Sequence, residues 1–264
     1  MHHPLRRPRV ERVGPDWPSF QGVPHFVGTS PTGAVSVYVD VTLGVPGQRN
    51  AQALLDDADR IVSRNAEIFG ASGSPVNVII FALHGATDGT GGADHAGCDY
   101  RSGNNIEVCA SFGNAARVSA LFEAELSECS MGGNLCGVSS GEALSRWCAA
   151  VVSGNALPDF ATAPRWAQDG MPNWVDQTEP TDQNADSTGC GMAFISWMLS
   201  LGISLERIAR GMVRLGDAAT LADLYGVLAG EPAPRAWPQF KAAVLALPGG
   251  VSGDDPFGAA APRG

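Results

Sequence analysis

The stretch AARVSALFEAELSECS, residues 115–130, decides how the rest of the chain is organised. Residues three or four positions apart share one side of an α-helix, because each residue turns the chain by about 100°. Here that side is an apolar stripe made of Val118, Phe122, Leu126 and Cys129. The stripe predicts a helix packed against a hydrophobic core.

Two glutamates lie at the margin of this stripe, one helical turn apart. Glu125 and Glu128 are separated by about 60° around the helix axis, whereas Glu123 points to the far side. Two carboxylates so close to a core repel each other and lose hydration, which raises the free energy of their charged forms. The presence of both glutamates therefore indicates that another group stabilises their charges or that they take part in a reaction.

The letters A-E-L-S-E at residues 124–128 resemble the H-E-x-x-H helix of the zincin metallopeptidases, with Ala124 and Glu128 in place of the two histidines. The order of the predicted elements over residues 35–197 also resembles a zincin: strand, long helix, strand, glycine-rich turn, short hairpin and then this helix. The resemblance implies an α+β fold, in which a small mixed sheet carries a central active-site helix beside a mainly helical C-terminal half.

The resemblance also implies roles for single residues. Glu125 stands where zincins keep the glutamate that takes a proton from zinc-bound water. Ala124 cannot bind a metal and Glu128 is a harder ligand than imidazole, so classical zinc proteolysis is disfavoured. A site made of Glu128, Glu142 and His95 would suit calcium or a loosely held divalent ion better than zinc.

Glu142 has two interpretations that the sequence leaves open. In the pattern Ser139-x-x-Glu142 it completes a capping box, in which the glutamate accepts a hydrogen bond from a free backbone amide at the start of a helix. By resemblance to the gluzincin branch, which takes a third metal ligand from a glutamate on a later helix, it faces the site instead.

The remaining elements follow from periodicity and from glycine and proline stops. Residues 35–43 and 75–83 are predicted strands, joined by a helix over 50–69, which suggests a parallel pair with a right-handed crossover. Residues 106–111 are predicted as an edge strand beside the central helix, placed to align a substrate. The further predicted helices cover 139–152, 190–201, 205–215, 220–228 and 237–247.

A glycine-rich segment at residues 85–99 suits a loop near a ligand, because its glycines allow close approach of the backbone. His95, Cys98 and Asp99 are metal ligands by residue type, but they lack the paired spacing of a zinc site. Structural hydrogen bonding is the favoured role for this cluster. If it has a site role, we expect His95 and Asp99 to bind substrate.

Residues 158–189 are predicted as a long irregular segment that forms a lid or a cleft wall. Trp174 with nearby acidic and amide groups makes a sugar-binding surface, although packing in the core is the ordinary use of tryptophan. Asp182 and Asp186 begin a pattern similar to a calcium-binding EF-hand loop. The required glycine is replaced by Ser187 and the bidentate glutamate by Ala193, so calcium is a minor alternative.

Six cysteines lie between residues 98 and 190. We predict at least one disulfide, with Cys98 paired to Cys109 across a hairpin or Cys129 to Cys136 at the end of the central helix. Disulfides slightly favour an extracytoplasmic location. Buried thiols in a cytosolic protein are the alternative.

Composition limits the partners and the domain layout. The net charge of −10 and a pI near 4.8 argue against nucleic acid or an anionic membrane. No run approaches the ~18 apolar residues of a membrane span, and the first 14 residues lack an apolar signal region.

We expect three parts along the chain: an extended N-terminal arm over 1–34, a single zincin-like domain over 35–248 and a flexible tail over 249–264. Within the domain, residues 35–138 form the sheet and the central helix, and residues 139–248 form the helical part.

No G-x-S-x-G elbow or histidine spacing supports a serine triad, and classical zinc proteolysis is disfavoured. Catalysis by paired carboxylates is the mechanism that remains. A glycoside hydrolase without metal requires one protonated and one ionised carboxyl group. We therefore predict a hydrolase without cofactor, acting on a glycoside or another small molecule. A metal-dependent hydrolase or peptidase with unusual ligands, and a binding protein on a degenerate zincin scaffold, are the alternatives. The predicted catalytic residues are Glu125, Glu128 and Glu142, and the predicted substrate-binding residues are His95, Asp99, Trp174, Asp182 and Asp186.

Overall fold

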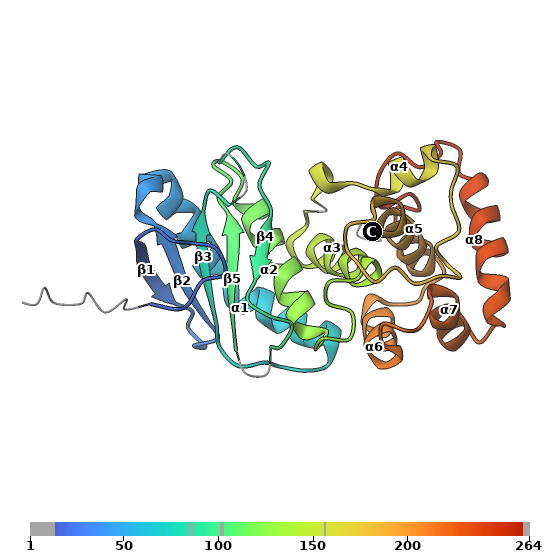
Figure 1. Ribbon diagram of the computed structural model, residues 1–264, viewed down its shortest axis with the longest axis horizontal. Coiled ribbons are helices and arrows are strands. Elements are labelled where there is room, and N and C mark those ends of the chain that lie inside the picture. The colour runs from blue at the N-terminus through green and yellow to red at the C-terminus, as the bar shows by residue number, and fades with distance from the viewer. Residues whose placement is uncertain (1–13, 84, 86, 101–102, 156, 261–264) are drawn as a thin grey trace, which may run out of the picture.

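A computed structural model describes residues 14–83, 85, 87–100, 103–155 and 157–260. Within these residues the protein is α+β, as predicted: a five-stranded sheet occupies one end and helices the other (Figure 1). The predicted order is also observed, because a strand, a long helix, a strand, a glycine-rich loop and a hairpin precede the central helix.

The sheet is mixed and has the order β1-β2-β3-β5-β4. The three inner strands are parallel, which confirms the predicted parallel pairing, and an antiparallel strand flanks them on each side. The strand predicted as an edge, residues 106–111, is inner strand β5, and the true edge beside the central helix is β4. The strands are β1 (Pro24–Thr29), β2 (Val35–Asp40), β3 (Val76–Phe81), β4 (Ala93–His95) and β5 (Asn104–Cys109).

Eight α-helices are described. Helices α1 and α2 contact the sheet, and α3 joins α2 to the helical half through its contacts with α5 (Figure 1). The helices are α1 (Gly44–Phe69), α2 (Ala115–Ser130), α3 (Ser139–Ser153), α4 (Ala163–Gln168), α5 (Ala185–Ser200), α6 (Leu205–Leu215), α7 (Leu221–Ala229) and α8 (Ala236–Leu245). The segment predicted to be irregular up to residue 189 therefore contains α4 and the first turn of α5.

Alternating side chains of the strands explain how the sheet is covered. Val35, Val37 and Val39 of β2 are buried in the core that the helices share. The opposite face of the sheet lies under the chain before β1, where Phe20 packs edge-on against Phe81, and Glu107 accepts hydrogen bonds from the backbone amides of residues 19 and 20. The described part of the predicted N-terminal arm is thus a cover for the sheet followed by strand β1; residues 1–13 lie outside the described residues.

The flexible tail predicted over residues 249–264 is wrong as far as residue 260; residues 261–264 lie outside the described residues. Asp254 is buried and accepts hydrogen bonds from the amides of Thr162 and Ala163 at 2.9 and 2.7 Å. Asp255 accepts a hydrogen bond from the hydroxyl of Ser196 at 2.6 Å. These two aspartates fix the segment from residue 254 to residue 260 against α4 and α5, on the helical half of the molecule (Figure 1).

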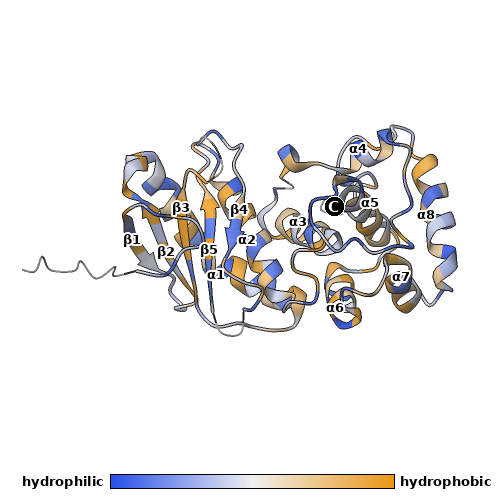
Figure 2. Cartoon of the chain, in the orientation of Figure 1, coloured by the Kyte–Doolittle hydropathy of each residue, from blue (hydrophilic) through white to orange (hydrophobic). Residues whose placement is uncertain are grey.

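Apolar residues form one continuous core that extends from the sheet to α8. Hydrophobic surfaces of the strands and helices turn toward this core, whereas hydrophilic residues gather on the outside (Figure 2). None of the described helices has the length and apolar character needed to span a membrane.

Candidate functional site

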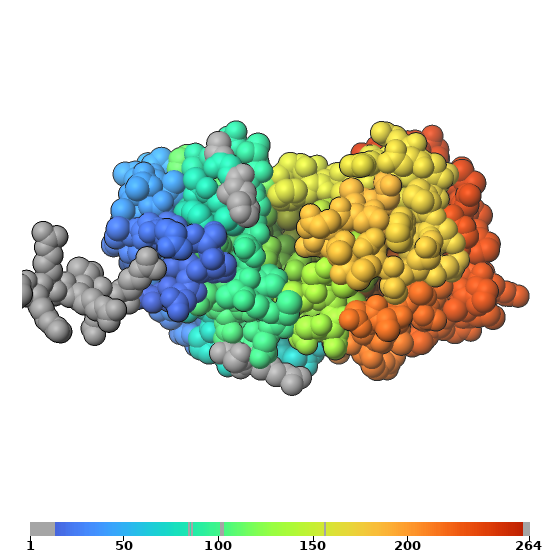
Figure 3. Space-filling model, in the orientation of Figure 1, coloured from blue at the N-terminus to red at the C-terminus, as the bar shows by residue number. Residues whose placement is uncertain are grey.

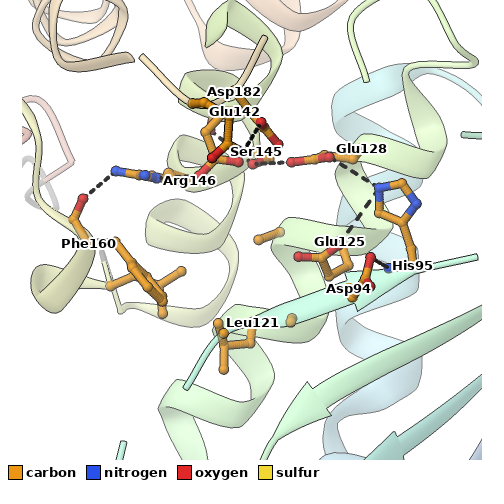
Figure 4. A pocket seen from close by; sticks show the side chains of 15 residues that line it. Asp94, His95, Leu121, Glu125, Glu128, Glu142, Ser145, Arg146, Phe160 and Asp182 are labelled. Atoms are coloured by element: carbon orange, nitrogen blue, oxygen red, sulfur yellow. Dashed lines mark hydrogen bonds and ion pairs between the residues drawn. The ribbon is translucent and has the colours of Figure 1, made fainter. Parts of the chain in front are cut away.

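A polar pocket of about 310 Å³ lies where the sheet half meets the helical half. It opens in the furrow between these halves that the space-filling view shows (Figure 3). The side chains come from β4, α2 and α3 and from two loops of the helical half (Figure 4). The lining includes Asp94, His95, Leu121, Glu125, Glu128, Glu142, Ser145, Arg146, Leu157, Phe160, Asp182 and Gln183.

Helix α2 carries two of the predicted catalytic acids to this pocket. The helix begins after Asn114, whose side-chain oxygen accepts a hydrogen bond from the backbone amide of Arg117 at 3.1 Å. Most residues of the helix are buried. Glu125 and Glu128 keep only 14% and 12% of their side chains exposed. Both point from the same side of α2 into the pocket, as the apolar stripe predicted (Figure 4).

His95, at the end of β4, lies between the two glutamates. Its Nε2 is 3.2 Å from Oε2 of Glu128 and 3.8 Å from Oε2 of Glu125 (Figure 4). Edge strand β4 positions this imidazole, because it pairs with β5 beside the helix. The structure therefore brings His95 together with Glu125 and Glu128, whereas the predicted set joined His95 to Glu128 and Glu142.

Helix α3 contributes the third predicted acid, and the capping-box interpretation of Glu142 is wrong. The helix has Val138 as its N-cap with no side-chain cap bond, and the hydroxyl of Ser139 donates to the carbonyl of Thr181 at 2.7 Å. Glu142 instead faces the pocket, where Nε of Arg146 donates to it at 2.7 Å. Glu142 thus lies in the pocket and not at the helix cap, and its role as a metal ligand stays a prediction.

The protein environment sets the pKa values of the three acids apart. Burial, reinforced by the charges of Glu128 and Glu142, raises the pKa of Glu125 well above its usual range. Burial alone would also raise the pKa of Glu128, but hydrogen bonds from His95, Glu142 and Ser145 and the charge of His95 outweigh burial and hold that pKa below its usual value. Burial raises the pKa of Glu142 to about 7, although Arg146 opposes this rise.

The carboxylate of Glu128 stabilises the protonated form of His95. Burial lowers the pKa of the imidazole, but the hydrogen bond and the charge of Glu128 outweigh burial, and the net pKa of His95 is raised. The pocket therefore holds one carboxylate that is readily ionised, one that retains its proton, and an imidazole that stabilises the ionised one.

The structure places the other predicted substrate-binding residues in different surroundings. Asp182 lines the pocket. Asp99 lies on the far side of the β4–β5 loop, at two other surface hollows. Trp174 packs against the core, and Asp186 lies near Asp169 in the first turn of α5, so neither side chain lines this pocket.

Several pocket residues were not predicted. Ser145 donates to Glu128 at 3.3 Å, and Arg146 binds Glu142 and the carbonyl of Phe160. Phe160 supplies the aromatic wall that was expected from Trp174. Spacing along α3 carried a signal for Ser145 and Arg146, since they follow Glu142 by three and four positions and share its side of the helix. No comparable signal exists for Phe160, whose place depends on a loop.

The cysteine pairing differs from both predicted pairs. Cys98 is bonded to Cys136, with their Cα atoms 5.9 Å apart, and the bond joins the loop after β4 to the loop between α2 and α3. At least one disulfide was predicted correctly, but the partners come from loops whose approach is set by the packing of β4 on α2. The other four cysteines are buried thiols: Cys109, Cys129, Cys148 and Cys190.

A zincin-type zinc site does not fit these residues. Ala124 offers no ligand atom, Glu128 is engaged by His95 and Ser145, and Glu142 is engaged by Arg146. A different set is closer to metal-binding geometry, because one ligand atom each from His95, Glu125 and Glu128 lies within 4.8 Å of the others.

No protein-family model, curated protein or solved structure matches this chain. Its chemistry is therefore inferred from the geometry of the pocket.

Proposed function

We propose that the protein is a hydrolase on a zincin-like scaffold, which cleaves a glycoside with Glu125 as general acid and Glu128 as the ionised base or nucleophile. One observation carries this proposal: two glutamates on one face of α2 share a pocket and a histidine, while their pKa values are shifted in opposite directions. Such a division is what two carboxyl groups need to act as acid and base at the same pH.

The lining of the pocket supports a neutral, hydroxyl-rich substrate. Carboxylates accept hydrogen bonds from hydroxyl groups, and the pocket offers several of them together with the amide of Gln183. An anionic substrate would be repelled by the same groups. Phe160 and Leu121 provide an apolar wall against which the carbon face of a sugar ring can pack.

The closeness of the acids favours a retaining over an inverting mechanism. One carboxylate oxygen of Glu125 lies within 4.8 Å of one of Glu128. Inverting enzymes separate their two carboxyl groups by about 6.5–9.5 Å to leave room for a water molecule, whereas retaining enzymes hold them closer together. In this mechanism Glu125 protonates the leaving oxygen, Glu128 attacks the anomeric carbon, and Glu125 then takes the proton from the water that releases the sugar.

The test is the release of phenol from a panel of aryl glycosides, with wild type, Glu125→Gln, Glu128→Gln and the control Glu231→Gln, which lies outside the pocket. We expect Glu125→Gln to lower kcat by about 10²–10⁴-fold with a poor leaving group, but much less with an acidic dinitrophenol, which departs without a proton. Glu128→Gln loses activity with both, and Glu231→Gln retains it. Activity should fall below the pKa of Glu128 and above the pKa of Glu125.

Absence of turnover by wild type on the whole panel would reject glycoside hydrolysis and favour a ligand-binding role. Full activity of Glu125→Gln with the poor leaving group would remove Glu125 from the mechanism.

A second candidate, a metal-assisted hydrolase, rests on the convergence of His95, Glu125 and Glu128. Together they offer one imidazole and two carboxylates, and a divalent ion held there would polarise a carbonyl group or activate water. Loss of turnover after chelation, with recovery on adding a divalent cation, would favour this candidate over the metal-free one.

A further inference from the structure

The Cys98–Cys136 disulfide lies directly beside the imidazole of the pocket. Nε2 of His95 is 3.6 Å from Sγ of Cys136. One ligand atom from each of His95, Cys98 and Cys136 lies within 4.8 Å of the other two. One nitrogen and two sulfur ligand atoms thus meet around one point, and the same nitrogen is 3.2 Å from Oε2 of Glu128.

The distance between His95 and Cys136 matches that between two ligands of a tetrahedral zinc ion. A Zn–N bond of about 2.1 Å and a Zn–S bond of about 2.3 Å place nitrogen and sulfur ligands about 3.6 Å apart. The observed separation between Nε2 of His95 and Sγ of Cys136 is 3.6 Å. The two sulfurs are closer to each other than two zinc ligands, because they are bonded in the disulfide.

The backbone around the cysteines can accommodate their separation. Thiolate ligands of one zinc ion lie about 3.8 Å apart, which requires a movement of about 2 Å from a disulfide. Gly132, Gly133 and Gly137 flank Cys136 in left-handed conformations, and Gly97 precedes Cys98 with open space around it. Both cysteines are partly exposed, so a reductant can reach them.

We propose that Cys98, Cys136 and His95 form a zinc site that exists only when the disulfide is reduced. A dithiol reductant supplies two electrons and two protons, is oxidised to its own disulfide, and leaves two cysteine thiols. Zinc binding then displaces both thiol protons to solvent and forms two Zn–S bonds. Thiolate ligands make this site selective for zinc over calcium or magnesium.

The two states of the cysteines have opposite effects on the pocket. In the oxidised state, His95 and Glu128 remain available to the carboxylate pair. In the zinc state, Nε2 of His95 is bound to the metal, so Glu128 loses its hydrogen bond with the imidazole and hydrolysis stops. This consequence rests on the proposed function, whereas the metal site itself does not.

The test uses the full chain, reduced with a phosphine in the absence of oxygen, and Co²⁺ as a coloured substitute for zinc. We expect one Co²⁺ per chain, a thiolate-to-cobalt charge-transfer band in the near ultraviolet, and displacement of the cobalt by one equivalent of Zn²⁺. The oxidised protein should give no such band. Cys98→Ser and His95→Ala should each weaken zinc binding by about 100-fold or more, and Cys190→Ala, a buried cysteine of α5, should not.

His95→Ala leaves the disulfide intact, so it tests the site even if loss of a cysteine impairs folding. Absence of the band in reduced wild type, or an unchanged band in Cys98→Ser, would overturn the proposal. Metal binding without the band and lost in Glu125→Gln would also overturn it, and would place the metal at the carboxylates instead. The glycoside screen on oxidised protein is independent of all these results.

Discussion

Glu123 shows how the surroundings of one side chain set its protonation. The sequence placed it on the far side of α2, and the structure places that side against α1, where the carboxyl group is fully buried. Its Oε1 accepts hydrogen bonds from Asn65 and Ser127, both at 3.1 Å. Burial raises the pKa of Glu123 to about 8, although these hydrogen bonds oppose the rise.

The pKa of Glu123 predicts a loss of stability at alkaline pH. A carboxyl group whose pKa is higher in the folded state than its ordinary 4.5 stabilises the fold fully below pH 4.5, and this contribution disappears as the pH rises through about 8. Each pKa unit corresponds to about 1.4 kcal/mol. We expect the free energy of unfolding of wild type to fall between pH 5 and pH 9, and Glu123→Gln to reduce this fall by a few kcal/mol.

Urea unfolding of both proteins at the two pH values measures this difference. The exposed variant Glu67→Gln, on α1, serves as the control. An equal fall in wild type and Glu123→Gln would show that Glu123 is already ionised at pH 5.

Elements with a strong local pattern were predicted well from the sequence. The central helix was predicted over 115–130 and is observed as Ala115–Ser130, because its apolar spacing and its end at a glycine-rich loop are local properties. Strand β1 was missed, since a proline-rich segment gives no strand signal until β2 offers it hydrogen bonds. Glu125 and Glu128 were predicted for the same local reason, whereas Phe160 and the disulfide depend on loops that only the complete fold brings together.

Close packing between α4 and α5 yields a prediction at the scale of elements. A Cβ atom on Gly189 of α5 would lie 2.7 Å from the carbonyl carbon of Thr162 and closer still to its oxygen. Alanine is ordinarily better than glycine within a helix by about 1 kcal/mol. Here the backbone cannot yield without separating the two helices, so we expect Gly189→Ala to destabilise the protein by about 1–3 kcal/mol.

Thermal unfolding of Gly189→Ala and Gly249→Ala checks this expectation. Gly249 has no heavy atom within 4 Å of the position of an added Cβ, so its variant should melt close to wild type. A melting temperature of Gly189→Ala equal to or above that of wild type would contradict the observed helix contact.

At the scale of the whole molecule, the C-terminal segment is connected to the pocket. Oδ1 of Asp254 accepts the amides of Thr162 and Ala163, and its Oδ2 lies 3.7 Å from Arg146, which in turn binds Glu142. Asp254, in the C-terminal segment, thus supports Arg146 of the pocket, which lies more than 100 positions earlier in the chain.

Asp254→Ala should therefore affect both stability and activity. Two backbone amides lose their acceptor in a buried place, which costs about 1–3 kcal/mol. Arg146 loses an anchor, so turnover should fall as well. Denaturant unfolding and glycoside turnover measure the two effects, with the exposed Asp217→Ala as control. If Asp254→Ala unfolded at the same denaturant concentration as wild type, the C-terminal segment would not stabilise α4.

The order of the strands determines when the pocket can appear during protein synthesis. Strand β4 leaves the ribosome before β5, yet in the sheet it pairs only with β5, which lies between it and β3. A nascent chain that ends before residue 109 therefore holds His95 on a strand without a partner. The imidazole meets Glu125 and Glu128 only after β5 and α2 have been translated, so a chain that ends before residue 109 has neither the cluster of His95 with the two glutamates nor the Cys98–Cys136 disulfide.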